Sequence, residues 1–274
     1  PRPANQSPVD LVRIACRLDE LPEVLPAVVW LKSYGYDVAI NIMQISDCNL
    51  IQVKDLTTMV SDYPLDVLYF ADSMGSMSPD AIARLVCLLR EGWQGELGIH
   101  THDNMGMALA NTLRAQAEGV SWLDATVTGM GRGPGNARSE ELSIEAMLIR
   151  NRPANLIPIM TLIREIFMPM KDRFRWGTNP YYYLAGKFGI HPTYIQKMIS
   201  DTRFDDEDIL AVIDHLSSNG GKHFSVDALT GARQFYCGEL CGSWKPSVMM
   251  ANRDVLILGT GPGVNDHRAA IEAY

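Results

Sequence analysis

The sequence predicts an α/β protein in which parallel β-strands alternate with helices and are followed by a helical extension. Three observations support this fold class: short β-rich runs recur at the spacing of strand–helix units, helix start and stop signals lie between them, and the pattern from about residue 141 is helical. The predicted strands are residues 11–16, 37–43, 66–71, 96–102 and 123–129.

Two of the connecting helices have clear boundary signals. A helix is predicted over residues 78–92, because Ser78 can cap it and Pro79 suits its first turn. A second helix is predicted over residues 105–118, with Gly119 as its C-terminal stop.

The pattern divides the chain into four regions. Residues 1–150 carry the strand–helix units, and residues 151–220 form the helical extension. Residues 221–250 are richer in Gly, Ser and Lys and predict a linker. Residues 251–274 predict a strand, a Gly-rich turn and the start of a helix, as in the first unit of a nucleotide-binding domain. Because GTGPG departs from the GxGxxG spacing, a truncated neighbouring domain is the alternative interpretation.

The composition argues against several classes of partner. Lys and Arg total 24 against 32 Asp and Glu, giving a formal charge of −8, so attraction to nucleic acid or to an anionic membrane is not expected. No apolar run approaches the roughly 18 residues that a membrane span requires. The five cysteines form no CxxC pair. We therefore expect a soluble, cytoplasmic protein whose partners are small molecules or other proteins.

Two histidines in "GIHTHDNMG" indicate a metal site. His100 and His102 are two residues apart in a predicted strand, so their side chains point to the same side. They lie at the carboxyl end of that strand, where parallel α/β folds place their chemistry. The alternative is that one histidine packs against a helix and the other is solvated.

A divalent ion held by two imidazoles also needs oxygen ligands. Asn136 closes the glycine-rich segment "GMGRGPGN", whose backbone can approach a ligand closely, although Asn136 could instead cap the following helix. Asp72 could orient a ligand or substrate, or merely form a turn. The candidates for oxygen ligands are Asp72, Asp103, Asn104, Asp124 and Asn136.

Three segments in order, "ADSMGSMSP", "HTHDNMG" and "GMGRGPGNARSEEL", make the chain resemble the DRE-TIM metallolyase superfamily, which is HMG-CoA lyase-like. The first segment is most similar to the 4-hydroxy-2-oxovalerate aldolase branch. The resemblance implies a (β/α)8 barrel and a divalent metal ion, Mn²⁺ first and otherwise Mg²⁺, Co²⁺ or Zn²⁺, that handles an enolate. It further implies that His100, His102 and Asn136 are metal ligands. Apart from the resemblance, Asp72 and Asn104 are the candidates for contacting substrate or orienting a ligand.

Two departures from the family pattern refine this expectation. Gly133 stands where the acyl-CoA lyases carry a catalytic cysteine, which argues against that branch. The chain also lacks the "DRE" or "RDG" strand that supplies the family's aspartate ligand and arginine. Its five strands resemble the fourth to eighth strands of the barrel, so we expect a partial TIM barrel with about three strand–helix units upstream of Pro1.

By this resemblance the protein is a metal-dependent aldolase that cleaves a 4-hydroxy-2-oxo acid to pyruvate and an aldehyde. Tyr182 or Tyr183 in "NPYYYLAG" is the candidate proton donor, with packing of the extension onto the barrel as the alternative role. A Claisen-condensing synthase of the isopropylmalate synthase type is a second hypothesis. A non-catalytic barrel that serves as an interaction module is a third. The helical extension is the expected contact for a homo-oligomer or a partner enzyme.

Overall fold

The computed structural model describes residues 2–235, 250–253 and 267–273. The chain divides into two units, Pro1–Tyr236 and Cys237–Tyr274, and the sheet and the helical extension both belong to the first. In the second unit, Arg268–Glu272 forms the short helix α13. The strand and Gly-rich turn predicted within residues 251–274 lie largely outside the described residues.

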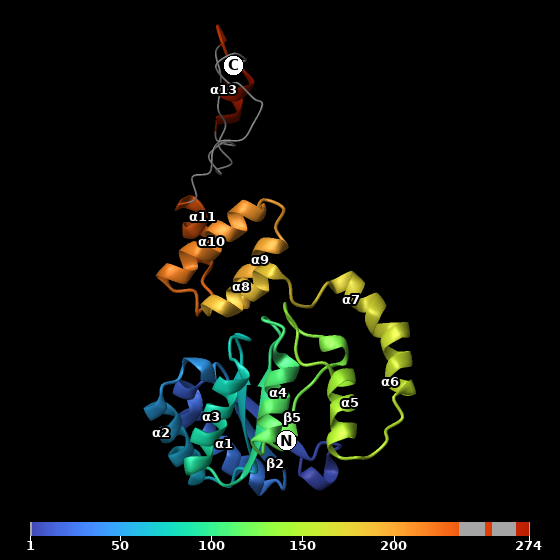
Figure 1. The fold of residues 1–274 in the computed structure, drawn as a ribbon. Helices are drawn as coiled ribbons and strands as arrows, with labels where there is room; N and C mark the ends of the chain where they lie inside the picture. The colour runs from blue at the N-terminus through green and yellow to red at the C-terminus, as the bar shows by residue number, and fades with distance from the viewer. Residues whose placement is uncertain (1, 236–249, 254–266, 274) are drawn as a thin grey trace. The chain divides into compact units, whose positions relative to one another are not determined.

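The first unit is built on a sheet of parallel strands in sequence order (Figure 1). The strands are β1 (Leu11–Cys16), β2 (Asp37–Ile42), β3 (Val67–Asp72), β4 (Glu96–Thr101) and β5 (Trp122–Leu123). This arrangement confirms the predicted fold class, a partial TIM-barrel-like sheet followed by helices. The first four strands begin and end within one residue of their predicted bounds.

The fifth strand is shorter than the predicted range 123–129. Asp124 N still donates to Ile99 O of β4 at 3.1 Å, but Thr126 N donates to Ala137 O at 2.9 Å. The backbone therefore pairs with the returning limb of the glycine-rich loop and leaves the sheet. The sequence pattern does not reveal that the backbone changes its hydrogen-bond partner from β4 to the loop, because β4 and the loop offer the same backbone groups.

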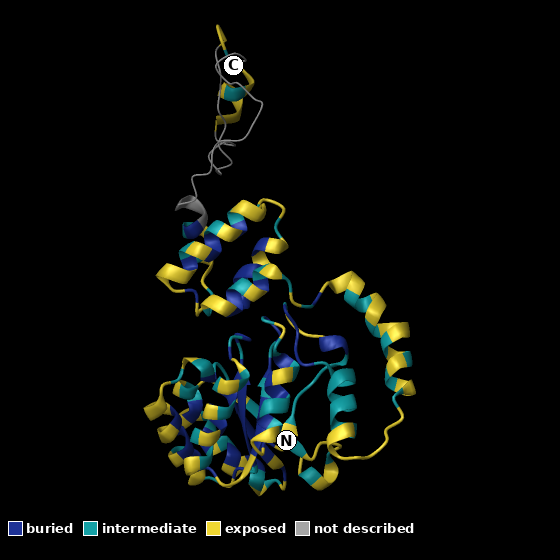
Figure 2. Cartoon of the chain, in the orientation of Figure 1, coloured by how far each residue is buried: buried dark blue, intermediate teal, exposed yellow. Residues whose placement is uncertain are grey.

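Four helices cover the outer face of the sheet: α1 (Leu21–Ser33), α2 (Leu50–Ser61), α3 (Pro79–Gly92) and α4 (Ala108–Ala117). Alternate strand residues such as Ile40, Leu68 and Ile99 are fully buried against them and form the main core (Figure 2). Ser78 caps α3 as predicted, since its Oγ accepts from Ala81 N at 3.3 Å.

The inner face of the sheet is more polar and carries Arg13, Asn41, Tyr69 and His100 on its strands. Arg13 places its guanidinium carbon 4.6 Å from the centre of the Tyr69 ring. The ring lies across Gly98 of β4, where a Cβ atom would overlap it. Gly98 thus makes room for the aromatic ring beside the polar residues of the inner face.

We expect Gly98→Ala to destabilise the protein by about 1–3 kcal/mol, because the added methyl group must displace the Tyr69 ring. The midpoint of urea unfolding measures this loss. Gly231→Ala is the matched control, since Gly231 is helical and nothing lies within 4 Å of the added Cβ. Equal midpoints for Gly98→Ala and the parent protein would contradict the expected overlap.

The thiols should differ strongly in reactivity. Cys16 is buried, and this burial together with Glu20 and Asp19 raises the pKa of its thiol to about 11. A raised pKa keeps the thiol protonated at neutral pH, whereas the thiolate is the reactive form. At pH 8 we expect maleimide to label exposed Cys87 rapidly and Cys16 only after unfolding, as peptide mapping by mass spectrometry would show. Rapid labelling of native Cys16 would contradict this.

The helical extension begins directly after the sheet. Its elements are α5 (Ser139–Ile149), α6 (Ile157–Leu162), a π-helical turn (Ile163–Phe167), α7 (Met168–Phe174), α8 (Pro180–Phe188), α9 (Pro192–Ile199), α10 (Asp206–Asn219) and α11 (Val226–Phe235). A second core forms among α8 to α11, around Tyr194, Ile195 and Ile213. By contrast, α6 and α7 have no buried residues (Figure 2). Within the described ranges, no helix combines the length and apolar character needed to cross a membrane.

Helix α11 occupies part of the range 221–250 that composition predicts to be a linker. Ser225 accepts a hydrogen bond from Ala228 N at 3.2 Å, and Ala232 is buried in the second core. Apolar residues at helical spacing therefore outweigh the Gly, Ser and Lys content that suggested a linker. Residues 236–249 lie outside the described residues.

The extension is joined to the carboxyl ends of the strands by hydrogen bonds. Gly177 N donates to Gly133 O at 2.9 Å, and Trp176 Nε1 donates to Thr128 O at 3.1 Å. Thr178 Oγ1 donates to Asn104 O at 2.6 Å. These bonds bring α8 and α9 to the edge of the sheet where the two histidines lie.

Candidate active site

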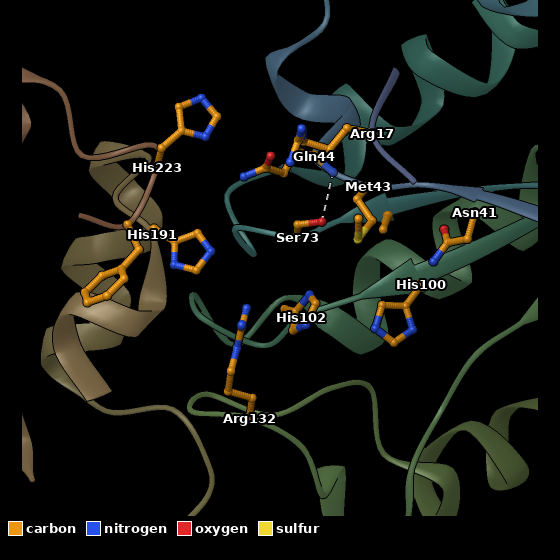
Figure 3. A pocket seen from close by; sticks show the side chains of 12 residues that line it. Arg17, Asn41, Met43, Gln44, Ser73, His100, His102, Arg132, His191 and His223 are labelled. Carbon is orange, nitrogen blue, oxygen red and sulfur yellow. Dashed lines mark hydrogen bonds between the residues drawn. The ribbon is translucent and has the colours of Figure 1, made fainter. Parts of the chain in front are cut away.

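The structure brings the two histidines together at the end of β4. Their ring centres are 5.0 Å apart, and both side chains line one cavity (Figure 3). His102 Nδ1 lies 3.1 Å from Asp72 O, and His100 Nδ1 lies 2.9 Å from Asp124 Oδ2. A carbonyl oxygen and an ionised carboxylate only accept hydrogen bonds, so each Nδ1 carries a hydrogen and each Nε2 is left free of these contacts.

His102 is also held in its neutral form. Burial first, and then the neighbouring His100, lower the pKa of His102 to about 4, against the raising effect of its hydrogen bond to Asp72. An imidazole with this pKa is uncharged at neutral pH. Two neutral rings with free Nε2 lone pairs are the state in which histidine binds a metal.

A charged network fixes His100. Arg13 Nη1 of β1 donates to both oxygens of Asp124, at 2.9 and 2.7 Å, and Asp124 in turn accepts from His100. Burial alone would raise the pKa of Asp124, but His100 and Arg13 hold it below its usual value. Asp124, one of the candidate oxygen ligands, therefore orients a histidine and bridges the two edge strands of the sheet.

Arg13 received no role from the sequence. A charged residue in the middle of the apolar strand "LVRIAC" was the available signal, because it departs from the apolar pattern of its strand. The partner lies 111 residues away along the chain, and only the folded sheet identifies it.

Asn136 lies beside His102, with which it forms an isolated backbone bridge. Its side-chain Nδ2 donates to Met130 O at 3.1 Å, whereas its Oδ1 is buried without a hydrogen-bond partner. The side chain does not cap α5, whose N-cap residue is Arg138. Asn136 is not among the residues that line the histidine cavity, but a buried amide oxygen without a partner, on the residue whose backbone pairs with His102, is the kind of donor that a divalent ion takes.

The donor set is mixed. Nowhere in the described residues do three or more His, Cys, Asp or Glu side chains gather as a metal cluster. The candidate set is the one predicted from the sequence: two imidazole nitrogens from His100 and His102 and one amide oxygen from Asn136. Three protein donors leave room for substrate or water, which favours a catalytic role over a structural one.

The carboxylate of Asp72 does not line the cavity. It is fully buried and accepts hydrogen bonds from Ser76 N at 3.0 Å and Met77 N at 3.1 Å. Burial raises the pKa of Asp72 to about 6, against the lowering effect of these bonds. The side chain therefore shapes the turn after β3, and Asp72 reaches the histidines through its main-chain oxygen, which holds His102.

Asn104 and Asp103 also lie away from the cavity wall. Asn104 is fully buried, and neither of its amide atoms has a hydrogen-bond partner. Asp103 Oδ1 accepts from Ala108 N at 3.0 Å, at the start of α4. The Asp103 carboxylate therefore stabilises the first turn of α4. A contact of Asn104 with substrate stays a prediction.

The two candidate tyrosines occupy different environments on α8. Tyr182 is buried, and its hydroxyl lies 3.1 Å from the position of a Cβ atom at Gly133. Tyr183 is 46% exposed and lines a separate pocket with Met105 and Thr178. Neither is among the described residues that line the histidine cavity, so the structure does not bring Tyr183 to the histidines. Tyr182 packs the extension against the glycine-rich loop, and its catalytic role stays a prediction.

The cavity has a volume of about 500 Å³. Its wall also includes Asn41 and Ser73 from the sheet side, and His191 and His223 from the helical extension, whereas Arg132 rises from the glycine-rich loop beside His102 (Figure 3). Sequence reasoning assigned none of these five a role. For Arg132 a signal was available in the sequence, because it is the single charged residue of "GMGRGPGN".

Residues 15–162, more than half of the chain, match the family model described as HMGL-like. The chain belongs to the HMGL-like family. The family match and the relatives below confirm the resemblance to the DRE-TIM metallolyases and to their aldolase branch.

Several relatives of this HMGL-like protein are named 4-hydroxy-2-oxovalerate aldolases. One from Nocardia farcinica is 30% identical over 142 residues, which cover 52% of this chain and 41% of the relative. One from Thermus thermophilus is 44% identical over 86 residues, which cover 31% of this chain and 25% of the relative. One from Brevibacillus brevis is 27% identical over 233 residues, which cover 83% of this chain and 68% of the relative. The match thus spans less than half of the first two of these relatives.

Solved structures share the fold. The N-terminal domain of a putative aldolase from Bacteroides vulgatus has a TM-score of 0.65 and 27% identity, with 71% of this chain and 65% of that chain covered. The carboxyl transferase domain of Rhizobium etli pyruvate carboxylase has a TM-score of 0.60 and 18% identity, with 82% and 41% covered. The second likeness concerns the fold alone.

Proposed function

We propose that this HMGL-like protein is a divalent-metal-dependent aldolase that cleaves a 4-hydroxy-2-oxo acid to pyruvate and an aldehyde. The observation that carries the proposal is the pair of imidazoles that line one cavity with their Nε2 atoms left free by the hydrogen bonds of Nδ1. The unpartnered Oδ1 of Asn136, whose backbone pairs with His102, supports it. The names of the related aldolases supply the reaction class.

The residues present fit a divalent ion, with Mn²⁺ as the first choice and Mg²⁺, Co²⁺ or Zn²⁺ as alternatives. His100 Nε2, His102 Nε2 and Asn136 Oδ1 would hold it. When bound, such an ion acts as a Lewis acid toward the carbonyl oxygen of a 2-oxo acid, an effect worth several kcal/mol in a transition state.

Other residues of the cavity wall can bind and orient the substrate. Ser73 Oγ accepts from Gln44 N at 2.9 Å, so its hydroxyl hydrogen is free to donate to a substrate oxygen. Asn41 Oδ1 is buried without a partner and can accept from a substrate hydroxyl. In the proposed reaction the 4-hydroxyl group loses its proton and becomes the aldehyde carbonyl. The C3–C4 bond breaks, and C3 takes up a proton to become the methyl group of pyruvate.

The test is pyruvate release from a 4-hydroxy-2-oxo acid by the Mn²⁺-loaded protein, followed through lactate dehydrogenase. We expect activity that a chelator abolishes and added Mn²⁺ restores. Consumption of an acyl-CoA with a 2-oxo acid, without pyruvate release, would instead favour the condensing synthase. A protein that binds no metal and turns over neither substrate would favour the interaction module.

A further inference from the structure

We propose that the substrate of this cavity carries a second anionic group, a carboxylate or a phosphate, and that Arg132 and His191, which line the cavity together with the histidine pair, bind it. The proposal rests on the proposed aldolase function for the orientation of the substrate. The anion site itself rests on the positions and hydrogen-bond donors of Arg132 and His191.

Arg132 extends from the glycine-rich loop into the cavity (Figure 3). In the part of the chain that the structure describes, no carboxylate pairs with it. Its charge bears on groups around the cavity, since it helps to lower the pKa values of His102 and His191. A guanidinium that faces a cavity without a carboxylate partner presents its fork of donors to an anionic ligand.

His191 offers a neutral hydrogen-bond donor in the same cavity. It is the N-cap residue of α9, and its Nδ1 accepts from Thr193 N at 3.3 Å. Because Nδ1 accepts, the ring hydrogen is on Nε2. Burial first, and then the charges of Arg132 and His223, lower the pKa of His191, which keeps the ring neutral. In the histidine pair the hydrogen is on Nδ1, whereas in His191 it is on Nε2. His191 therefore offers a hydrogen-bond donor at Nε2, the atom that His100 and His102 leave free for a metal.

The other arginine of the wall is already paired. Arg17 contacts Asp19 at 3.1 Å and Glu20 at 3.0 Å. No Asp or Glu lines the cavity among the described residues, so nothing there cancels the charge of Arg132. The cavity therefore combines two kinds of group, lone pairs for a cation on the histidine pair and donors for an anion on Arg132 and His191.

The cavity can hold a substrate that reaches both ends. A volume of about 500 Å³ lies in the range of pockets that take ligands much larger than pyruvate. With the 2-oxo acid group at the histidine pair, the other end of the molecule is the part left to contact Arg132 and His191. That end becomes the aldehyde product, so the proposal assigns an anionic aldehyde to the reaction.

Binding can be tested without turnover. The chelator-treated protein is titrated calorimetrically with inorganic phosphate, with succinate and with neutral succinamide. We expect saturable binding of at least one anion and none of succinamide, weakened at least tenfold by Arg132→Ala. The stronger of the two anions indicates whether the group is a phosphate or a carboxylate. Arg152→Ala, at an exposed position outside the cavity, is the charge-matched control.

A second variant separates the anion contact from the stability of α9. His191→Asn keeps a side chain that caps helices well but does not place a ring Nε2–H in the cavity. It should weaken anion binding while the thermal midpoint changes little. Absence of saturable anion binding, or equal binding by the parent protein and Arg132→Ala, would overturn the proposal.

Activity provides the second arm. We expect the parent protein with Mn²⁺ to show a kcat/KM for pyruvate release at least tenfold higher for a 4-hydroxy-2-oxo acid with an anionic substituent than for its neutral analogue. Arg132→Ala should bring this ratio close to one. Equal kcat/KM values of the parent protein for the anionic and the neutral substrate would overturn the anion site. If neither substrate releases pyruvate, the aldolase function fails, whereas the titration still decides the anion site.

Discussion

Replacing His102 with alanine is expected to lower Mn²⁺ affinity and pyruvate release by more than the 10- to 100-fold typical of residues that only orient a ligand. The variant removes a neutral ring whose Nε2 lone pair is left free by the hydrogen bond from Nδ1 to Asp72 O. Metal content after dialysis, determined by mass spectrometry, and the rate of pyruvate release measure the two losses.

The matched control for this variant is His267→Ala. His267 is exposed and is not among the residues that line the cavity, so its removal deletes an imidazole that is not part of the candidate site. Circular dichroism should show that both variants keep the secondary structure of the parent. Full metal content and activity in His102→Ala would show that the histidine pair is structural.

Asp124→Ala is expected to lower Mn²⁺ affinity by about 10- to 100-fold, because it removes the carboxylate that holds the Nδ1 hydrogen of His100. It also leaves Arg13 without the partner that it contacts at 2.7 Å, so we expect lower stability to urea as well. Titration of the chelator-treated protein with Mn²⁺, followed by electron paramagnetic resonance, measures the affinity.

Two further variants sharpen this prediction. Arg13→Ala should weaken Mn²⁺ binding in the same direction but less, because Asp124 would still accept from His100. Asp172→Ala removes an exposed carboxylate from α7 and should leave Mn²⁺ binding unchanged. An affinity in Asp124→Ala equal to that of the parent would mean that His100 does not depend on this carboxylate.

Much of the site could be predicted because it depends on local spacing. Strand geometry alone places His100 and His102 on one side of β4, and the parallel sheet places them at its carboxyl edge. The glycine-rich loop that carries Asn136 follows the last strand, and the structure confirms that it returns to His102. The sequence alone therefore determined the fold class and the position of the candidate metal ligands.

The tertiary structure decided which partners these residues have. Packing across the sheet paired Arg13 with Asp124 and so fixed the hydrogen on His100. Docking of the extension brought Arg132 and His191 to one cavity, and left Tyr183 on a separate surface. The physical reason is that periodicity reports which face of an element is buried, whereas hydrogen bonds and charge pairs between distant segments depend on how the elements pack.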